Sequence, residues 1–372
     1  MKSSDKTNFY LLPSNFEQEQ MMSSKILGCC NPTTLSRCKN ILRGIRETSR
    51  QTNKYYSSNC EKKPSTVAEI VKHWSHRFEN EGISEPVESI EHILAHILGT
   101  RKIMDLANIP EQQLSEDQVS KLLALCECRM SRWVLAKMPV QYIIGEWDFR
   151  DITLKMIPPV FIPRPETEIL VDIVLRRIAA MKTECCKILD IGCGSGAISL
   201  ALVHANNKVI KCTAIDRSLY ACHLTKQNAE ALGLQDNMEI LNAILRENGE
   251  IKLLNTVEKA PKIEEEQFDI IVSNPPYIPT GKLPDLAPEI KIYEDLRALD
   301  GGKDGLNTIK ALMKYASKAL VPSGLLFMEV DHLHPEYIEF FTKKYTKLNL
   351  FHEHIYKDYC CNDRFVELSK LQ

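Results

Sequence analysis

The feature that most constrains the fold is an apolar run that ends abruptly at two prolines. Residues 268–272 are apolar except for Asp269, a pattern typical of a parallel strand buried on both faces. Pro275 and Pro276 end the strand, because proline has no N–H group to donate to a sheet. Residues 274–277 therefore lie at the carboxyl edge of the strand, where open α/β sheets bind their ligands.

The segment Asn274-Pro275-Pro276-Tyr277 carries groups suited to holding a planar nitrogen. The side-chain oxygen of Asn274 and the main-chain carbonyl of Pro275 are both acceptors, so together they can bind the two N–H groups of an amide or an exocyclic amine. Tyr277 can lie on the flat π-system and exclude water. The alternative is a strand followed by a plain Pro-Pro turn, and the upstream sequence decides between the two.

Strand-like and helix-like segments alternate through the C-terminal half of the chain. This order predicts an α/β fold with a doubly wound sheet. Two further apolar stretches, 348–356 and 364–369, would close the sheet, and 246–266 is expected to be a polar insertion. Strands are expected at Lys187–Ile191, Val209–Ile215, Met238–Leu241, Phe268–Ser273 and Leu325–Val330, with helices near 166–181, 197–205, 218–232 and 305–320.

A glycine-rich turn follows the first of these strands and opens a helix. Its residues are Asp190-Ile191-Gly192-Cys193-Gly194-Ser195-Gly196, and glycines let the backbone turn sharply and approach a ligand closely. Asp216 ends the second strand, about 20 residues later, as recognition of a ribose requires. A dinucleotide site is the competing interpretation. The G-x-G-x-G spacing and the preceding acid Asp190 favour S-adenosylmethionine, which has no pyrophosphate and carries cationic groups.

The N-terminal third has a different organisation. Residues 1–65 are basic, acid-poor and amphipathic, which is typical of a mitochondrial transit peptide, although a disordered basic tail is the alternative. Residues 66–135 have apolar positions at helical spacing, with helices expected from Thr66, from Pro86 and from Asp117 to Trp133. Residues 136–165 are expected to form a β-hairpin linker to the main domain at 166–372.

Charge and cysteine content exclude several classes of protein. The formal net charge is −2, but residues 1–60 carry nine Lys/Arg and four Asp/Glu. The remaining residues therefore have a net charge of −7, which makes them poor non-specific phosphate binders. No run approaches the roughly 20 apolar residues that span a membrane. The thirteen cysteines show no C-x-x-C pairing, so reduced thiols and no metal site are expected.

Taken together, these motifs resemble the HemK/PrmC protein-glutamine methyltransferases. The resemblance rests on the glycine turn and Asn274–Tyr277, on the segment Ile162–Glu168, and on further matches at Val140–Glu146, Asp358-Tyr359 and Asn362–Arg364. The mitochondrial branch of the family is suggested by Leu286–Ile290, Glu329-Val330-Asp331 and His334-Pro335-Glu336. The resemblance implies a class I S-adenosylmethionine-dependent methyltransferase, with a Rossmann-like sheet and a small N-terminal helical domain for substrate docking.

The resemblance also implies roles for individual residues. Asp190, the turn 192–196 and Asn274 would contact the cofactor, with Asp216 on its ribose hydroxyls. Many relatives have an acid or aromatic residue after the third strand to contact the adenine, whereas this chain has Asn242, whose amide would substitute. Asn274 and Pro275 would be catalytic and, with Pro276 and Tyr277, would bind the glutamine of the Gly-Gly-Gln loop of a release factor.

The expected protein is therefore a monomeric enzyme of the mitochondrial matrix whose partner is a peptide-chain release factor. It would bind neither membrane nor nucleic acid directly. An adenine-N6 methyltransferase acting on nucleic acid is the competing enzyme, because an exocyclic amine presents the same two donors, and it would need base flipping and a basic groove. A third possibility is a non-catalytic scaffold that keeps the fold.

Overall fold

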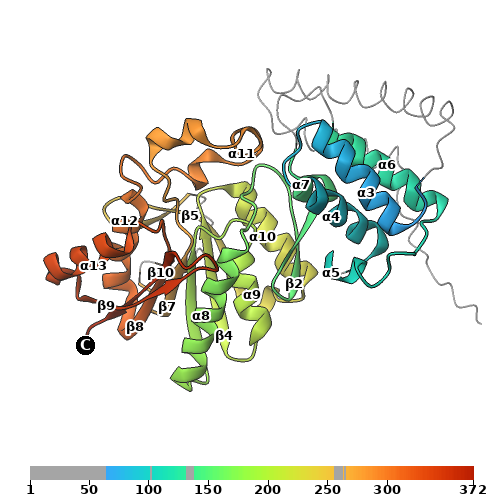
Figure 1. The fold of residues 1–372 in the computed structure, drawn as a ribbon. Coiled ribbons are helices and arrows are strands. Elements are labelled where there is room, and N and C mark those ends of the chain that lie inside the picture. Colours follow the sequence, from blue (N-terminus) through green and yellow to red (C-terminus); the bar gives the residue numbers. More distant parts are fainter. Residues whose placement is uncertain (1–63, 101–102, 131–137, 255–262, 264) are drawn as a thin grey trace, which may run out of the picture. The chain divides into compact units, whose positions relative to one another are not determined.

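The computed structural model describes residues 64–100, 103–130, 138–254, 263 and 265–372 (Figure 1). The leader predicted for residues 1–65 lies, except for its last two residues, outside the described part of the chain. The described residues form two compact units, one made of 64–90 with 109–130 and the other of 91–108 with 138–372.

Amphipathic helices make up the first unit, as the sequence predicts. Helix α3 (Val67–Asn80) begins with a capping box, in which Thr66 accepts from the Glu69 N–H and the Glu69 side chain returns to the Thr66 backbone. The buried face of α3 includes Trp74 and Phe78, which are at most 1% exposed. Helix α6 (Glu116–Met130) confirms the third predicted helix, whose last residues lie outside the described part. Between them in sequence come α4 (Pro86–Leu98), which crosses the unit division, and α5 (Ile103–Leu106).

The second unit is built on an eight-stranded sheet with the order β6-β5-β4-β3-β7-β8-β10-β9. Strands β5, β4, β3, β7 and β8 run parallel to one another, and β6, β10 and β9 are added antiparallel at the two ends. The strands are β3 (Cys186–Ile191), β4 (Ile210–Asp216), β5 (Met238–Leu245), β6 (Ile251–Leu253), β7 (Phe268–Ser273), β8 (Leu320–Glu329), β9 (Leu350–Lys357) and β10 (Asp363–Lys370).

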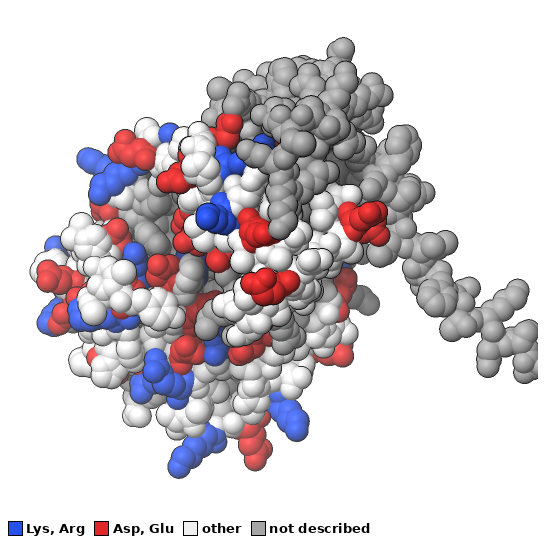
Figure 2. Space-filling view, turned by 45° about the vertical axis from the view of Figure 1, so that its right-hand side comes forward, with Lys and Arg blue, Asp and Glu red and all other residues white. Residues whose placement is uncertain are grey.

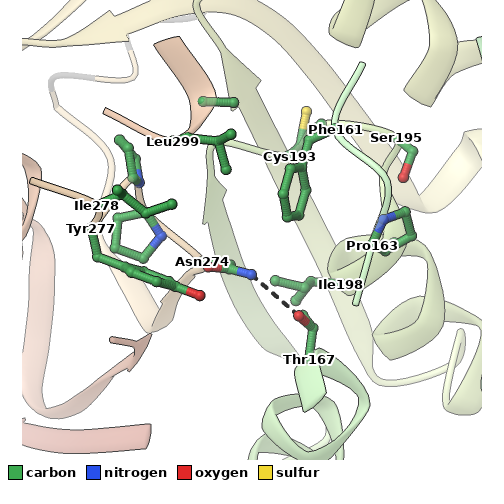
Figure 3. A pocket seen from close by; sticks show the side chains of 16 residues that line it. Phe161, Pro163, Thr167, Cys193, Ser195, Ile198, Asn274, Tyr277, Ile278 and Leu299 are labelled. Atoms are coloured by element: carbon green, nitrogen blue, oxygen red, sulfur yellow. Dashed lines mark hydrogen bonds between the residues drawn. The ribbon is translucent and has the colours of Figure 1, made fainter. Parts of the chain in front are cut away.

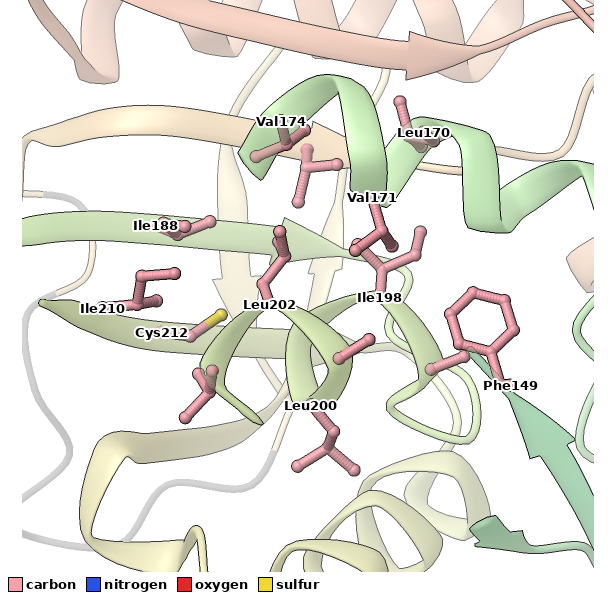
Figure 4. Close-up of a cluster of buried hydrophobic side chains, with 14 of the residues drawn as sticks. Phe149, Leu170, Val171, Val174, Ile188, Ile198, Leu200, Leu202, Ile210 and Cys212 are labelled. Atoms are coloured by element: carbon pink, nitrogen blue, oxygen red, sulfur yellow. The ribbon is translucent and has the colours of Figure 1, made fainter. Parts of the chain in front are cut away.

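Helices cover both faces of this sheet, because successive strand residues point to opposite sides. Ile188, shown in Figure 4, belongs with Ile270 to one apolar cluster that includes residues of α8 and α9. Their neighbours Leu189 and Ile271 belong to a second cluster with α12 and α13. The doubly wound α/β fold is confirmed. The helices are α8 (Glu166–Met181), α9 (Ala197–Ala205), α10 (Leu219–Ala231), α11 (Pro288–Tyr293), α12 (Asn307–Ala319) and α13 (Pro335–Lys344), with short 3-10 turns η1 (Gln235–Asn237), η2 (Thr280–Asp285), η3 (Leu296–Ala298) and η4 (Thr346–Leu348).

Some local predictions were wrong. The segment 136–165, predicted as a β-hairpin, includes helix α7 (Val140–Ile144), which ends at Gly145 in a left-handed conformation at φ 77°. Short apolar runs do not distinguish helix from strand. The expected hairpin is present but shorter, as β1 (Glu146–Phe149) paired with β2 (Ile152–Lys155). Its buried residue Phe149 belongs to the cluster under α8 and α9 (Figure 4). The insertion predicted for 246–266 contains strand β6, and β5 runs on to Leu245.

Among the described helices, none combines the length and apolar character needed to cross a membrane.

Candidate active site

Two neighbouring strands bring the glycine turn and the Asn-Pro-Pro-Tyr segment together. Strands β3 and β7 are parallel and adjacent, with Asp190 opposite Val272. The Ser273 hydroxyl donates a 2.6 Å hydrogen bond to the carbonyl of Ile191, which ties the two strand ends. Because parallel strands end at the same edge of a sheet, the residues that follow them share one site.

A cavity lies at this edge (Figure 3). It includes eight residues predicted from the two motifs for the cofactor or the substrate, and further residues that sequence reasoning did not assign to the site. Its lining residues are Phe161, Pro163, Thr167, Gly192, Cys193, Gly194, Ser195, Ala197, Ile198, Asn274, Pro275, Pro276, Tyr277, Ile278, Ala298 and Leu299.

The glycine turn leaves open space on its cavity side. Gly194 has φ 59°, and a Cβ placed there would meet no atom within 4 Å, so a ligand can approach its backbone. Gly196 is different, because a Cβ there would lie 2.7 Å from the Leu200 side chain. Glycine is thus needed at this second position for close packing of the turn on its own helix.

Asp190 is a buried carboxylate that lacks a partner. It is fully buried, and neither of its carboxylate oxygens makes a hydrogen bond within the described structure. Burial raises the pKa of Asp190 to about 7, although polar groups of Ser199 offset part of the rise. An unsatisfied acid under an open glycine turn fits a cofactor that carries positive charge, since a nearby cation favours the ionised form.

We expect Asp190→Asn to stabilise the cofactor-free protein at pH 8 but not at pH 4. Between the unfolded pKa of about 3.9 and the folded value of about 7, the folded protein keeps a proton that the unfolded chain has released. Wild-type stability therefore falls as pH rises through this window and stays low above it. Asparagine does not ionise, so the variant escapes this loss.

Thermal melts of both proteins at pH 4 and pH 8, without cofactor, measure the effect. Calorimetry at pH 8 should show weaker binding of S-adenosylmethionine to the variant. An equal difference in melting temperature at both pH values would contradict the role of the buried charge.

Asn274 is held by a chain of hydrogen bonds that leads to the buried carboxylate of Glu329. Its amide nitrogen donates to the Thr167 hydroxyl at 3.2 Å (Figure 3), and that hydroxyl donates to Glu329 Oε2 at 2.7 Å. The second oxygen of Glu329 accepts from the Tyr277 hydroxyl at 3.3 Å. Thr167 and Glu329 are each 2% exposed, so Asn274 has a fixed partner on the protein side.

Four residues predicted for the cofactor do not line the cavity: Asp190, Gly196, Asp216 and Asn242. The Asp216 carboxylate accepts from the N–H groups of Gly194 at 3.0 Å and Ser218 at 2.7 Å. It therefore shapes the glycine turn, and its contact with a ribose stays a prediction. The Asn242 amide nitrogen donates to the backbone carbonyl of Asp216 at 3.0 Å, so its contact with the adenine also stays a prediction.

Sequence reasoning gave no role in the site to Phe161, Thr167, Ile198 and Leu299, which line the cavity. Of these four, only Thr167 had a signal in the sequence, because it lies in the segment 162–168. That segment matched the family motif, but no chemical role in the site was assigned to it. Nothing local in the sequence marks Leu299, because η3 brings it to the cavity through the fold.

The parallel sheet, the open glycine turn over a buried acid and the adjoining Asn-Pro-Pro-Tyr segment together define a class I methyltransferase. A Methyltransferase small domain model matches residues 167–287, and a PrmC N-terminal domain model matches residues 69–145. The chain belongs to the family of release factor glutamine methyltransferases. S-adenosylmethionine is its cofactor.

The family assignment rests on similarity along most of the chain. The human MTRF1L release factor glutamine methyltransferase is 39% identical over 315 residues, which cover 82% of this chain and 88% of the relative. A release factor glutamine methyltransferase of Thermodesulfovibrio yellowstonii is 34% identical, over 66% of this chain and 79% of the relative. Among solved structures, a T. thermophilus 16S rRNA N2 G1207 methyltransferase in complex with AdoMet and guanosine has 18% identity and a TM-score of 0.40, over 61% of this chain and 50% of that one.

Proposed function

We propose that this enzyme methylates the side-chain amide nitrogen of the glutamine in the Gly-Gly-Gln motif of a peptide-chain release factor. The observation that carries this proposal is that Asn274 and Pro275 line the same cavity as the open glycine turn. Two hydrogen-bond acceptors for a substrate amide, the Asn274 side-chain oxygen and the Pro275 carbonyl, thus lie beside the turn that would hold the methyl donor. Bound S-adenosylmethionine supplies a methyl group activated by its sulfonium.

The chain's own residues make the target nitrogen reactive by position. An amide nitrogen is a poor nucleophile, because its lone pair is delocalised into the carbonyl. Asn274 and Pro275 would accept hydrogen bonds from both N–H groups, which raises the electron density on nitrogen and fixes its direction of approach. Such positioning can lower a barrier by up to about 7–11 kcal/mol. Pro276 and Tyr277 would bind the rest of the side chain and exclude water, and the surplus proton would leave to water after transfer.

The cofactor contacts belong to the same proposal. The turn 192–196 would wrap the methionine part of the cofactor, with Asp190 as the buried counter-charge. Asp216 would bind the ribose hydroxyls and Asn242 the adenine. Asp216 ends β4, and Asn242 lies opposite it on the neighbouring strand β5, which supports this because ligands of such sheets bind where the parallel strands end.

The domain roles and the cellular location extend the proposal. Residues 66–135 would dock the protein substrate, 136–165 would link this region to the domain 166–372, and residues 1–65 would direct the protein to the mitochondrial matrix, where it acts as a monomer. The match of residues 69–145 to the PrmC N-terminal domain supports the docking region, residues 66–135, as a feature of the family. A fusion of residues 1–65 to a reporter tests the mitochondrial targeting. A reporter that stays in the cytosol would refute it.

The surface charge favours a protein substrate over nucleic acid. On the described part of the face shown in Figure 2, acidic and basic side chains are interspersed, without a continuous basic band. An adenine-N6 methyltransferase would use a basic groove to hold its strand. The net charge of −7 outside residues 1–60 argues in the same direction.

Incubation with labelled S-adenosylmethionine and either a mitochondrial release factor, DNA or RNA tests the proposal. We expect label only on the release factor, and mass spectrometry should place one added methyl group on the Gly-Gly-Gln glutamine. A release factor whose glutamine is replaced by alanine serves as the control. Label on nucleic acid, or none on the release factor, would overturn the proposal.

A further inference from the structure

We propose that Thr167 and Glu329 are positioning residues that set which end of the Asn274 amide faces the substrate. This inference deepens the proposed function and rests on it. The three side chains come from the first turn of α8, the end of β8 and the loop after β7, which lie far apart in the sequence. They are linked by the two hydrogen bonds described above, of 3.2 Å and 2.7 Å.

The Thr167 hydroxyl has a single hydrogen to donate. Ionised Glu329 can only accept hydrogen bonds, so the 2.7 Å contact takes that hydrogen. Glu329 Oε1 also accepts, from Tyr277. Burial raises the pKa of Glu329 above its ordinary value, and the hydrogen bonds from Thr167 and Tyr277 and the positive charge of Arg364 offset only part of this rise. The contacts of both oxygens agree with an ionised carboxylate.

Because its hydrogen is committed to Glu329, the Thr167 oxygen can only accept from Asn274. The amide nitrogen of Asn274 must therefore point to Thr167, which leaves its oxygen for the substrate. This is the orientation that a glutamine amide needs, since its NH2 group requires an acceptor. If the Asn274 amide were reversed, its NH2 group would face the NH2 group of the substrate glutamine, and two donors would meet. The direction of these hydrogen bonds therefore decides whether the site accepts an amide at all.

Glu329→Gln should reverse that polarity without changing the size of the side chain. The glutamine oxygen would accept from Tyr277, and its nitrogen would donate to Thr167. The Thr167 hydrogen is then free for the Asn274 oxygen, and the Asn274 nitrogen turns to the cavity. We expect turnover to fall at least tenfold. Thr167→Val, which removes the hydroxyl, should cause a similar loss, and Thr167→Ser, which keeps it, should remain within threefold of wild type.

A binding measurement separates positioning from simple damage to the fold. A release factor with glutamate in place of the target glutamine presents only acceptors, so it matches the reversed amide. Calorimetry should show a severalfold shift in relative affinity from the glutamine form to the glutamate form in Glu329→Gln, and no shift in Thr167→Ser. A structural defect alone would weaken both forms equally.

These outcomes distinguish the two levels of the proposal. No methylation of the release factor by the wild-type protein would overturn the proposed function and this inference with it. Methylation by wild type together with near-normal turnover in Glu329→Gln, or an unchanged preference for the glutamine form, would overturn the positioning role alone. Melting curves and cofactor affinity, both expected to stay close to wild type, establish that the variants are folded.

Discussion

Asn274→Ala is expected to lower turnover at least about 100-fold, with the affinity for S-adenosylmethionine little changed. A loss of this size corresponds to about 2.7 kcal/mol of barrier, since each tenfold change is about 1.36 kcal/mol. Removal of one preorganised hydrogen-bonding group from the active site of an acyl-transfer enzyme costs a comparable amount. The alanine would remove the acceptor proposed to orient the substrate nitrogen but would leave untouched the glycine turn, which is proposed to hold the cofactor.

Single-turnover kinetics with a release factor and calorimetry with the cofactor measure the two halves of this prediction. Asn207→Ala is the matched control, because Asn207 is an exposed asparagine just before β4, at the opposite edge of the sheet. We expect it to retain wild-type turnover. Near-normal turnover in Asn274→Ala would remove the role assigned to this residue, and a parallel loss of cofactor binding would place its contribution in cofactor binding.

Arg177→Ala is expected to destabilise the fold by about 3 kcal/mol. Arg177 on α8 contacts the Glu367 carboxylate on β10 at 2.7 Å, and the Glu367 side chain is fully buried. Without the arginine, the carboxylate stays buried in the core and keeps the hydrogen bond that it accepts from the Tyr356 hydroxyl at 2.5 Å. The figure is at the lower end of the range for a broken buried pair, because the Arg177 side chain is 37% exposed.

Chemical denaturation curves test this effect. The neighbouring Arg176 is exposed, so Arg176→Ala should change the free energy of unfolding by no more than about 0.5 kcal/mol. Addition of Glu367→Gln to Arg177→Ala should recover part of the loss, since it removes the uncompensated charge. If the two arginine variants were equally stable, the buried carboxylate would not depend on its partner.

Local sequence patterns were sufficient to predict the parallel sheet and the two motifs that line the cavity. The glycines of the turn, the acid before them and the prolines after β7 act through covalent geometry and hydrogen-bonding capacity, which do not depend on distant residues. Strand-like runs at 187–191 and 268–273 were enough to place the two motifs at strand ends. Residues 140–144 were misassigned to the hairpin because a short, largely apolar run fits a helix as well as a strand.

The tertiary structure alone decided how the side chains of these motifs are used. Asp216, predicted for the ribose, turns its carboxylate to the N–H of Gly194, 22 residues away in sequence. The partner of Asn274 is Thr167, 107 residues earlier, and Thr167 in turn bonds to Glu329, 162 residues later. A motif specifies which atoms can donate or accept, whereas the direction of a rotatable amide depends on the residues that the fold packs beside it.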